Sequence, residues 1–147
     1  MTDEQYMRMA LEEARTALKE GEVPIGAVIV SNDRIVGRGH NLVETLNDVT
    51  AHAEMQAITA ASDTLGGKYL NECTVYVTVE PCSMCAAALG WAQIGRVVFG
   101  AHDEKRGYSK VYGSILGPLH PRTMVTGGIL AEECGSLMSD FFKTLRR

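Results

Sequence analysis

The chain has 147 residues, of which 46% are hydrophobic and 22% are charged, and its formal net charge is -4. This length and balance predict one globular domain, residues 1–147, and exclude a disordered or repetitive protein. No run reaches the roughly 18 apolar residues of a membrane span, and the N-terminus lacks the basic and apolar segments of an export signal. We therefore expect a cytoplasmic protein whose four cysteines are reduced.

Charge is distributed unevenly along the chain. Residues 1–95 hold 6 Lys and Arg against 13 Asp and Glu, a balance of -7, whereas residues 96–147 hold 8 against 5, a balance of +3. The acidic total argues against a nonspecific nucleic-acid binder, because phosphate contacts need Lys and Arg. An acidic polymer is therefore expected to meet the C-terminal third.

The first segments predict a helix followed by a β-hairpin. Thr2 or Asp3 can cap a helix whose apolar residues recur at helical spacing until Gly21. Two segments rich in Val and Ile, 26–30 and 34–41, flank a short SND turn. This pattern is typical of two paired antiparallel strands.

A polar loop is expected over residues 42–49, and a second helix from Ala51, with Asp48 or Thr50 available as its cap. The rest of the chain predicts a strand over 73–79, a helix over 83–92, a strand over 96–100, an irregular loop over 103–121 with about one helical turn, a strand over 124–126 and a helix over 129–145. Strands that alternate with helices favour a mostly parallel sheet covered on both faces. We expect an α/β fold, a three-layer α/β/α sandwich around a mixed, mostly parallel five-stranded sheet to which the hairpin adds an antiparallel strand.

Three possible zinc ligands, His52, Cys82 and Cys85, each lie near the first turn of a predicted helix. Helix N-termini favour the thiolate, which is the metal-binding form of cysteine. Two residues separate the cysteines, so both sulfurs can reach one ion at roughly 2.3 Å. Three protein ligands leave one tetrahedral position open, as in catalytic zinc sites, where the ion activates water near neutral pH. Glu54 is then the carboxylate placed to move the protons of a hydrolytic reaction.

Two other interpretations of these residues remain open at this point. A Cys-x-x-Cys pair after a strand also fits a thioredoxin-like redox site, and an ion enclosed by four protein ligands would only stabilise the fold. The sequence offers no obvious fourth ligand, because Cys73 and Cys134 lie far from the motif and are expected to be buried apolar side chains. The combination of HAE with EPCSMC favours the catalytic interpretation.

HAE followed by PCxxC resembles the signature of the zinc-dependent cytidine and adenosine deaminases. Over nearly the full chain, the segments EGEVPIGAVIV, GHN, DVTAHAEM, VYVTVEPCSMC, IGRVVFGAHDEKRG and GILAEECGSLMSDFF are together similar to the bacterial tRNA-specific adenosine deaminases. The resemblance implies a cytidine deaminase-like fold, one Zn²⁺ per chain and a homodimer. It also implies hydrolytic conversion of adenosine to inosine at the wobble position, 34, of a tRNA anticodon stem-loop, with Glu54 as the proton shuttle.

The resemblance further assigns a set of substrate contacts. They comprise Asn41, Val23 and Pro24 and the backbone near Ala53, Glu80 and Pro81 around the base, and Asp103, Lys105 and Phe142 on the flanking nucleotides. Phosphate contacts are expected from about half of Lys105, Arg106, Lys110, Arg122, Lys143, Arg146 and Arg147. His120 is a further candidate RNA contact, whereas His40 and His102 are expected to be structural.

One segment departs from the family pattern, and one related activity stays open. KRGYSKVYGSIL, residues 105–116, stands where the tRNA enzymes usually have a loop of small residues, and its Tyr108 and Tyr112 could stack on bases or fill a core or dimer contact. Deaminases of free guanine share HAE and EPC but usually end in a different C-terminal segment. Deamination of a free purine base such as guanine is therefore the alternative function.

Overall fold

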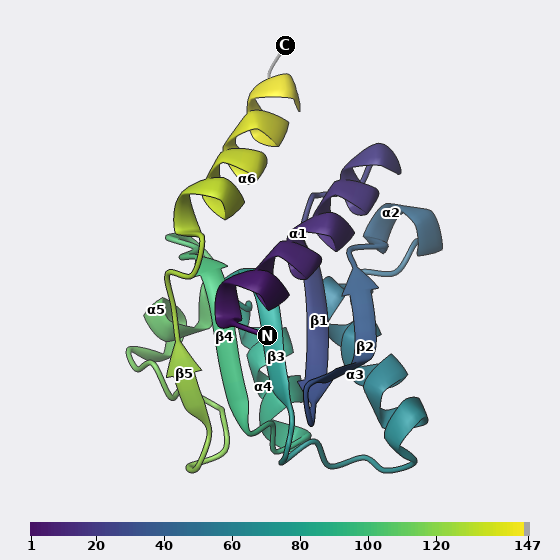
Figure 1. The fold of residues 1–147 in the computed structure, drawn as a ribbon. Coiled ribbons are helices and arrows are strands. Elements are labelled where there is room, and N and C mark those ends of the chain that lie inside the picture. The colour runs from purple at the N-terminus through teal and green to yellow at the C-terminus, as the bar shows by residue number, and fades with distance from the viewer. Residues whose placement is uncertain (146–147) are drawn as a thin grey trace.

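The computed structural model describes residues 1–145, which form a five-stranded mixed sheet between two layers of helices (Figure 1). The elements are α1 (Asp3–Lys19), β1 (Gly26–Ser31), β2 (Arg34–His40), α2 (Val43–Leu46), α3 (Ala53–Leu65), β3 (Thr74–Val79), α4 (Ser83–Trp91), β4 (Arg96–Ala101), α5 (Tyr108–Tyr112), β5 (Met124–Thr126) and α6 (Ala131–Leu145). The predicted three-layer α/β/α sandwich is confirmed. Within the described residues, no helix is both long and apolar enough to cross a membrane.

The strands lie in the order β2-β1-β3-β4-β5. β1 is antiparallel to both of its neighbours, while β3, β4 and β5 pair in parallel. Four strands therefore run in one direction and β1 alone runs against them, which confirms the mostly parallel sheet with one antiparallel strand from the hairpin. As a result, the carboxyl ends of β2, β3 and β4 meet the beginning of β1 at one edge of the sheet.

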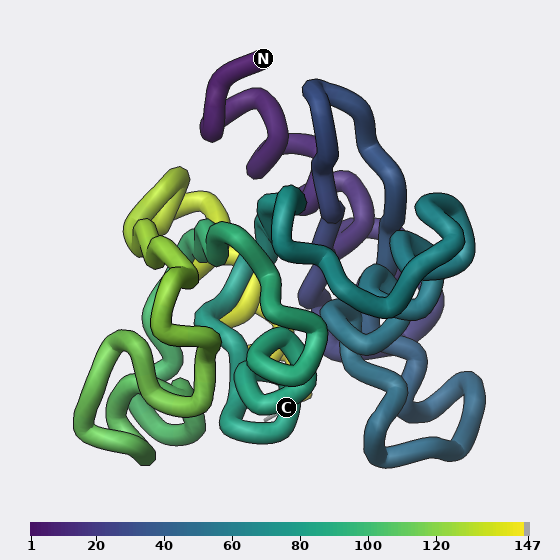
Figure 2. The backbone as a smooth tube through the Cα atoms, turned by 90° about the horizontal axis from the view of Figure 1, so that it is seen from below, coloured from purple at the N-terminus to yellow at the C-terminus, as the bar shows by residue number. Residues whose placement is uncertain are grey.

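Each face of the sheet is covered by its own helices. α1 and α6 pack on one face, and α3, α4 and α5 pack on the other; in Figure 2, α1 and α4 lie on opposite sides of the strands. The first face buries side chains that include Met7, Leu11, Val28 and Val98. The second buries Ile29, Ala57, Val77, Leu89, Phe99 and Tyr108 among others. In β1 and β4, neighbouring residues contribute to opposite cores, Val28 and Val98 to one and Ile29 and Phe99 to the other, as expected for a sheet buried on both faces.

α3 lies unusually close to β2, because two glycines of that strand have no side chain. A Cβ atom at Gly39 would lie 2.3 Å from the carbonyl oxygen of Ala53, and one at Gly37 would lie 2.5 Å from that of Ala57. The helix faces these glycines with the backbone of Ala53, Ala57 and Ala61 and with the Cβ atoms of Gln56 and Ala61. The first turn of α3 is thereby held over the end of β2.

The beginning of α1 agrees with its prediction. Thr2 is the N-cap, and its side chain and that of Gln5 form a reciprocal capping box. Asp3 is instead the first residue of the helix, and its carboxylate accepts two hydrogen bonds of 2.8 Å from Arg96.

Two expectations for residues 42–52 are wrong. The segment expected to be a loop contains the short helix α2, and α3 is capped neither by Asp48 nor by Thr50 but begins after His52. The carboxylate of Asp48 accepts hydrogen bonds from the amide and the hydroxyl of Thr50. Both side chains are therefore used within the turn and cannot reach the helix.

Candidate metal centre and active site

The three predicted ligands lie at the beginnings of two helices. His52 is the N-cap of α3 and Cys82 is the N-cap of α4, and both have extended backbone angles without a side-chain capping bond. N-cap residues are usually Ser, Thr, Asp or Asn, whose side chains bind the first amides of the helix. Here the imidazole and the thiol are left free to face one another, and Cys85, in the first turn of α4, completes the group.

The distances within this group fit one metal ion. Nδ1 of His52 lies 3.6 Å from Sγ of Cys82 and 3.5 Å from Sγ of Cys85. A tetrahedral zinc ion with bonds of roughly 2.3 Å to sulfur and 2.0–2.1 Å to nitrogen separates those atoms by about 3.6 Å. In the described part of the chain the group consists of these three side chains alone. If these three side chains held a tetrahedral ion, one position would be left open, as in catalytic sites and not as in structural ones.

The other two cysteines lie away from this group. Cys73 and Cys134 are buried in the hydrophobic core on opposite faces of the sheet, as expected. The sequence does not show on which face of the sheet each cysteine lies, but the apolar residues around each of them predict that both are buried. They leave the metal group with three ligands.

Burial and hydrogen bonding set the protonation of the groups around this centre. The pKa of Cys82 is lowered, because the thiol of Cys85 and the ring of His52 both hydrogen-bond to its sulfur. The carboxyl of Glu54, in the first turn of α3, is 4% exposed. Its burial raises its pKa to about 7. A thiolate and a protonatable carboxyl therefore lie side by side, the two chemical types that metal binding and proton transfer require.

The sheet topology brings most of the predicted substrate residues to the same edge. Val23 and Pro24 precede β1, Asn41 follows β2, Glu80 and Pro81 follow β3, and Asp103 follows β4. Ala53 lies next to the metal group on α3 and is 1% exposed. In open α/β sheets, ligands bind beyond the carboxyl ends of the strands. The edge that holds the metal group is therefore also the one expected to receive a substrate.

Other predicted RNA contacts lie further out. Phe142, near the C-terminal end of α6, is 40% exposed, and its ring packs edge-on against Phe141. In Figure 1, α6 extends beyond the sheet. Lys105 is exposed on the loop after β4. Arg146 and Arg147 lie outside the described residues. These four assignments stay predictions.

Tyr108, for which two roles were open, belongs to the core. Its ring is fully buried, and its hydroxyl donates to the carbonyl of Ile115. Its amide donates to the carbonyl of Pro81, and the preceding Gly107 forms a bridge with Cys82. α5 is therefore packed against the metal-binding loop, while Tyr112 at its other end is 49% exposed.

A buried carboxylate that the sequence analysis did not identify supports the same loop. The side chain of Glu80 accepts hydrogen bonds from His102 Nδ1 at 3.0 Å, from Ser109 N at 3.0 Å and from Ser109 Oγ at 2.5 Å. These bonds and one from the Asp103 amide lower its pKa, although burial alone would raise it. The resemblance assigns only the backbone near Glu80 to substrate binding. Nothing in the sequence around Ser109 indicates that this residue binds the Glu80 carboxylate. His102, for which a structural role is expected, contributes one of these hydrogen bonds.

Comparison with known proteins identifies the family. The tRNA-specific adenosine deaminase of Bacillus subtilis (strain 168) is 46% identical over 147 residues, which cover 99% of this chain and 91% of the relative. That of Aquifex aeolicus (strain VF5) is 44% identical over 99% of this chain and 97% of the relative. Residues 1–101 match the model of the cytidine and deoxycytidylate deaminase zinc-binding region. The chain belongs to this deaminase family.

Solved structures agree with this assignment. The deaminase is similar, with a TM-score of 0.82 and 40% identity, to a structure from studies of A-to-I editing by tRNA:A34 deaminases at the wobble position of transfer RNA, over 90% of this chain and 98% of the other. It is also similar to the guanine deaminase of Bacillus subtilis, with a TM-score of 0.69 and 36% identity over 77% and 76% of the two chains. The predicted resemblance to the bacterial tRNA-specific adenosine deaminases is confirmed, and so is a zinc-binding deaminase domain.

Proposed function

We propose that this deaminase hydrolyses adenosine to inosine, with release of ammonia, at the wobble position of a tRNA anticodon, and that residues 1–147 act as one domain. The observation that carries the reaction is the three-ligand group with a buried carboxyl beside it. His52, Cys82 and Cys85 would hold the zinc ion. In such a site zinc supplies Lewis-acid activation of water near neutral pH.

Glu54 is the proposed proton carrier of this reaction. It lies two residues after His52, its carboxyl is buried, and the thiol of Cys85 is its side-chain hydrogen-bond partner. A carboxylate there can accept a proton from the attacking water and deliver it to N1 of the purine, and can then move the second proton, from the new C6 hydroxyl, to the amine, which leaves as ammonia when the C6–N6 bond breaks. Asn41 on the same edge is the proposed hydrogen-bonding partner of the base, with Val23 and Pro24 beside it.

The tRNA substrate is supported by the relatives and by the chemistry of the target. Both curated relatives named above match over nearly their whole length, whereas the guanine deaminase matches over 76% of its chain. An anticodon loop already presents unpaired bases, which cost little energy to move out of the stack into a buried site. Asp103, Lys105 and Phe142 are the proposed contacts to flanking nucleotides, and we place the activity in the cytoplasm.

The test compares one RNA with the free purines. The purified, zinc-loaded chain is incubated in parallel with an anticodon stem-loop that carries adenosine at position 34 and with free adenine, adenosine and guanine. Nuclease digestion and chromatography measure inosine in the RNA, and an ammonia assay measures the free compounds. We expect inosine in the stem-loop and little ammonia from the free purines.

Two controls separate this outcome from the alternative. Glu54→Gln should retain about one zinc per chain and lose turnover, whereas loss of zinc in that variant would make Glu54 a ligand. Ammonia from guanine together with an unedited stem-loop would select a free-purine deaminase, the second candidate, which the similarity to a guanine deaminase favours.

We further propose that the deaminase forms a homodimer through the outer surface of α4. This helix is apolar on all sides, since besides the buried Cys85, Ala86 and Leu89 it carries Met84, Ala87, Ala88 and Trp91 on the outside. Trp91 is 84% exposed. A helix that is apolar all round is normally covered on all sides. Among the described helices and strands, those with which α4 makes more than minor contact are α3 and α5. A second copy would complete its burial close to the metal group.

A further inference from the structure

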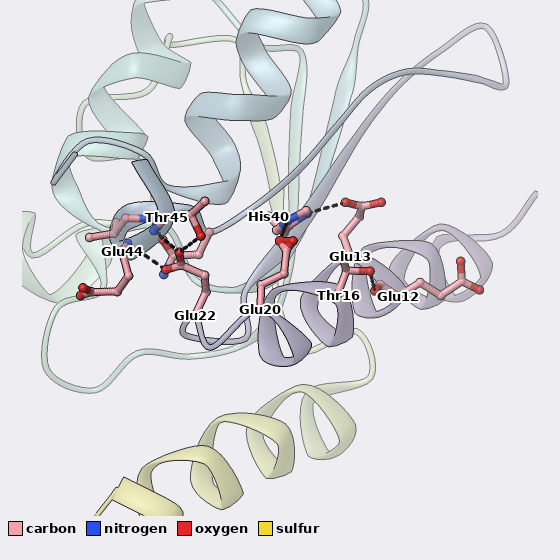
Figure 3. A network of polar contacts seen from close by, with 10 residues as sticks. Glu12, Glu13, Thr16, Glu20, Glu22, His40, Glu44 and Thr45 are labelled. Atoms are coloured by element: carbon pink, nitrogen blue, oxygen red, sulfur yellow. Dashed lines mark hydrogen bonds and ion pairs between the residues drawn. The ribbon is translucent and has the colours of Figure 1, made fainter. Parts of the chain in front are cut away.

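A buried acid, Glu22, caps a helix that is remote from it in sequence. Its side chain is fully buried and accepts hydrogen bonds from the Glu44 amide at 3.0 Å and from the amide and hydroxyl of Thr45, both at 2.6 Å (Figure 3). The N-cap position of α2 is Leu42, which has no capping side chain. Glu22 therefore supplies the acceptors for the second and third amides of the helix.

Asn41 completes the cap from the other side. Its side-chain Oδ1 accepts a hydrogen bond of 3.0 Å from the backbone amide of Val43. Its backbone amide donates a hydrogen bond of 3.1 Å to the carbonyl of Ile25. The first three amides of α2 are thus bound by the side chains of Asn41 and Glu22. The bond from Val43 fixes the orientation of the amide group, and in the described chain its NH₂ group, a donor, makes no hydrogen bond and is left to bind a base.

The residue before Asn41 is held from the same direction. Nδ1 of His40 lies 3.0 Å from Oε1 of Glu13, and Nε2 lies 2.6 Å from Oε1 of Glu20. Figure 3 shows these two acids and Glu22 reaching from α1 and the turn after it to the segment that leaves β2. Asn41 therefore lies between two points at which its chain is bound by carboxylates.

The hydrogen bonds that compensate the burial of this charge all come from the beginning of α2. Removing a carboxylate from water is costly unless hydrogen bonds compensate it. Here the bonds to Thr45 and Glu44 lower the pKa of Glu22, although burial alone would raise it, so the group is held as an anion. All of these bonds go to a helix of 4 residues, which adds little to the core and directly follows the proposed base-binding residue.

We propose that Glu22 is a positioning residue for substrate recognition. By capping α2 it fixes the amide of Val43, and that amide holds the Asn41 side chain with its NH₂ group directed at an acceptor atom of the purine. This inference rests on the proposed function, since Asn41 is a base contact only if a purine binds at this edge. It predicts that Glu22 acts through Asn41 and not through the stability of the fold.

A double-mutant cycle tests this coupling. Values of kcat/KM for the stem-loop are measured for the wild type, Glu22→Gln, Asn41→Ala and the double variant. The amide of Glu22→Gln keeps the shape but directs an NH₂ group at the amides of α2. We expect Glu22→Gln alone to lower kcat/KM by roughly 10- to 100-fold, the factor that corresponds to lost hydrogen bonds to a charged group. In the Asn41→Ala background the same change should cost less than about twofold.

Two further variants calibrate the cycle. Thr45→Val removes only the hydroxyl bond to Glu22 and should lower kcat/KM in the same direction by a smaller factor. Glu12→Gln changes an exposed acid on α1 and should behave as the wild type. Equal losses from Glu22→Gln in both backgrounds, together with a matching fall in Tm, would mean a structural role and overturn the proposal.

A second measurement does not depend on turnover. Amide hydrogen exchange is followed by NMR in the zinc-loaded, substrate-free protein. In Glu22→Gln the Val43 and Thr45 amides should exchange about tenfold faster and the Asn41 side-chain NH₂ resonances should shift, while zinc content stays at one ion per chain. Unchanged exchange at Val43 would contradict the inference. If the wild type edits no stem-loop but these signals do change, the proposed function fails and the positioning of Asn41 stands.

Discussion

The close contact between α3 and β2 predicts that Gly39→Ala damages the metal centre. An added Cβ would lie 2.3 Å from the Ala53 carbonyl oxygen and 2.7 Å from the Ala57 amide nitrogen. Both atoms belong to the backbone, so no side-chain rotation can relieve the overlap. Because ordinary contacts to Cβ begin near 3.4 Å, the first turn of α3 has to move by about 1 Å in this tightly packed layer.

That displacement acts directly on His52, which precedes Ala53, while both sulfur ligands belong to α4. Metal–ligand distances tolerate only about 0.2 Å, so a shift of this size separates the imidazole from Cys82 and Cys85. Overpacking of a core costs about 1–3 kcal/mol, and each kcal/mol lowers Tm by roughly 2–4 °C in a chain of this size. We expect a moderate loss of stability and a fall in zinc affinity of at least about tenfold.

Zinc affinity is measured by competition with a chromophoric chelator, and Tm by calorimetry with and without the metal. The matched control is Gly67→Ala, because a Cβ there meets nothing within 4 Å, so both values should stay at the wild-type level. Gly37→Ala pushes on Ala57 further along α3 and should lower Tm with less effect on zinc. A Gly39→Ala protein that binds zinc as tightly as the wild type would refute the argued link between the packing of α3 and the metal centre.

Three other outcomes follow from the same structure. Cys82→Ser should abolish binding of stoichiometric zinc, measured by mass spectrometry under native conditions; retained zinc would remove Cys82 from the ligand set. Trp91→Glu should convert the proposed dimer to a monomer in sedimentation experiments, and an unchanged dimer would place the interface elsewhere. The hydrogen bonds from Arg96 hold the pKa of Asp3 below its ordinary value of 3.8, so their stabilisation is present above about pH 4 and is lost as the pH falls through the lowered pKa. Asp3→Asn should therefore have a lower Tm at pH 6 and a smaller further decrease towards pH 2, whereas parallel curves for the two proteins would contradict this assignment.

The sequence predicted the metal group because its residues are close to the features that place them. His52, Cys82 and Cys85 lie at helix beginnings that strand, turn and proline signals mark locally. The same holds for the sheet, whose alternating helices and strands determine the layers. By contrast, α2 was missed because most of its cap is not local: Leu42 offers no capping side chain, and the carboxylate that binds the second and third amides comes from Glu22.

Long-range partners also explain two side-chain roles that the sequence did not show. GEVP has the composition of a solvated turn, and nothing within it shows that Glu22 is fully buried. The expected substrate contact of the backbone near Glu80 stays a prediction; its carboxylate, to which no role was assigned, binds Ser109 and His102 across 29 and 22 residues of sequence. Such pairs arise only when the strand order brings distant loops to the same edge, and one sequence carries no signal for them.

Three buried acids gather at this edge, and the groups that bind them separate their roles. Amide and hydroxyl donors surround Glu22 and Glu80, and in both the hydrogen bonds outweigh burial and lower the pKa. In the described chain, Glu54 is bound only by its own amide and by the thiol of Cys85, and burial raises its pKa to about 7. A carboxylate whose lone pairs are already occupied can hold a loop in place but cannot accept a proton readily. Glu54 alone of the three keeps that capacity, so replacing Glu22 or Glu80 should alter substrate geometry, whereas replacing Glu54 should stop the chemical step.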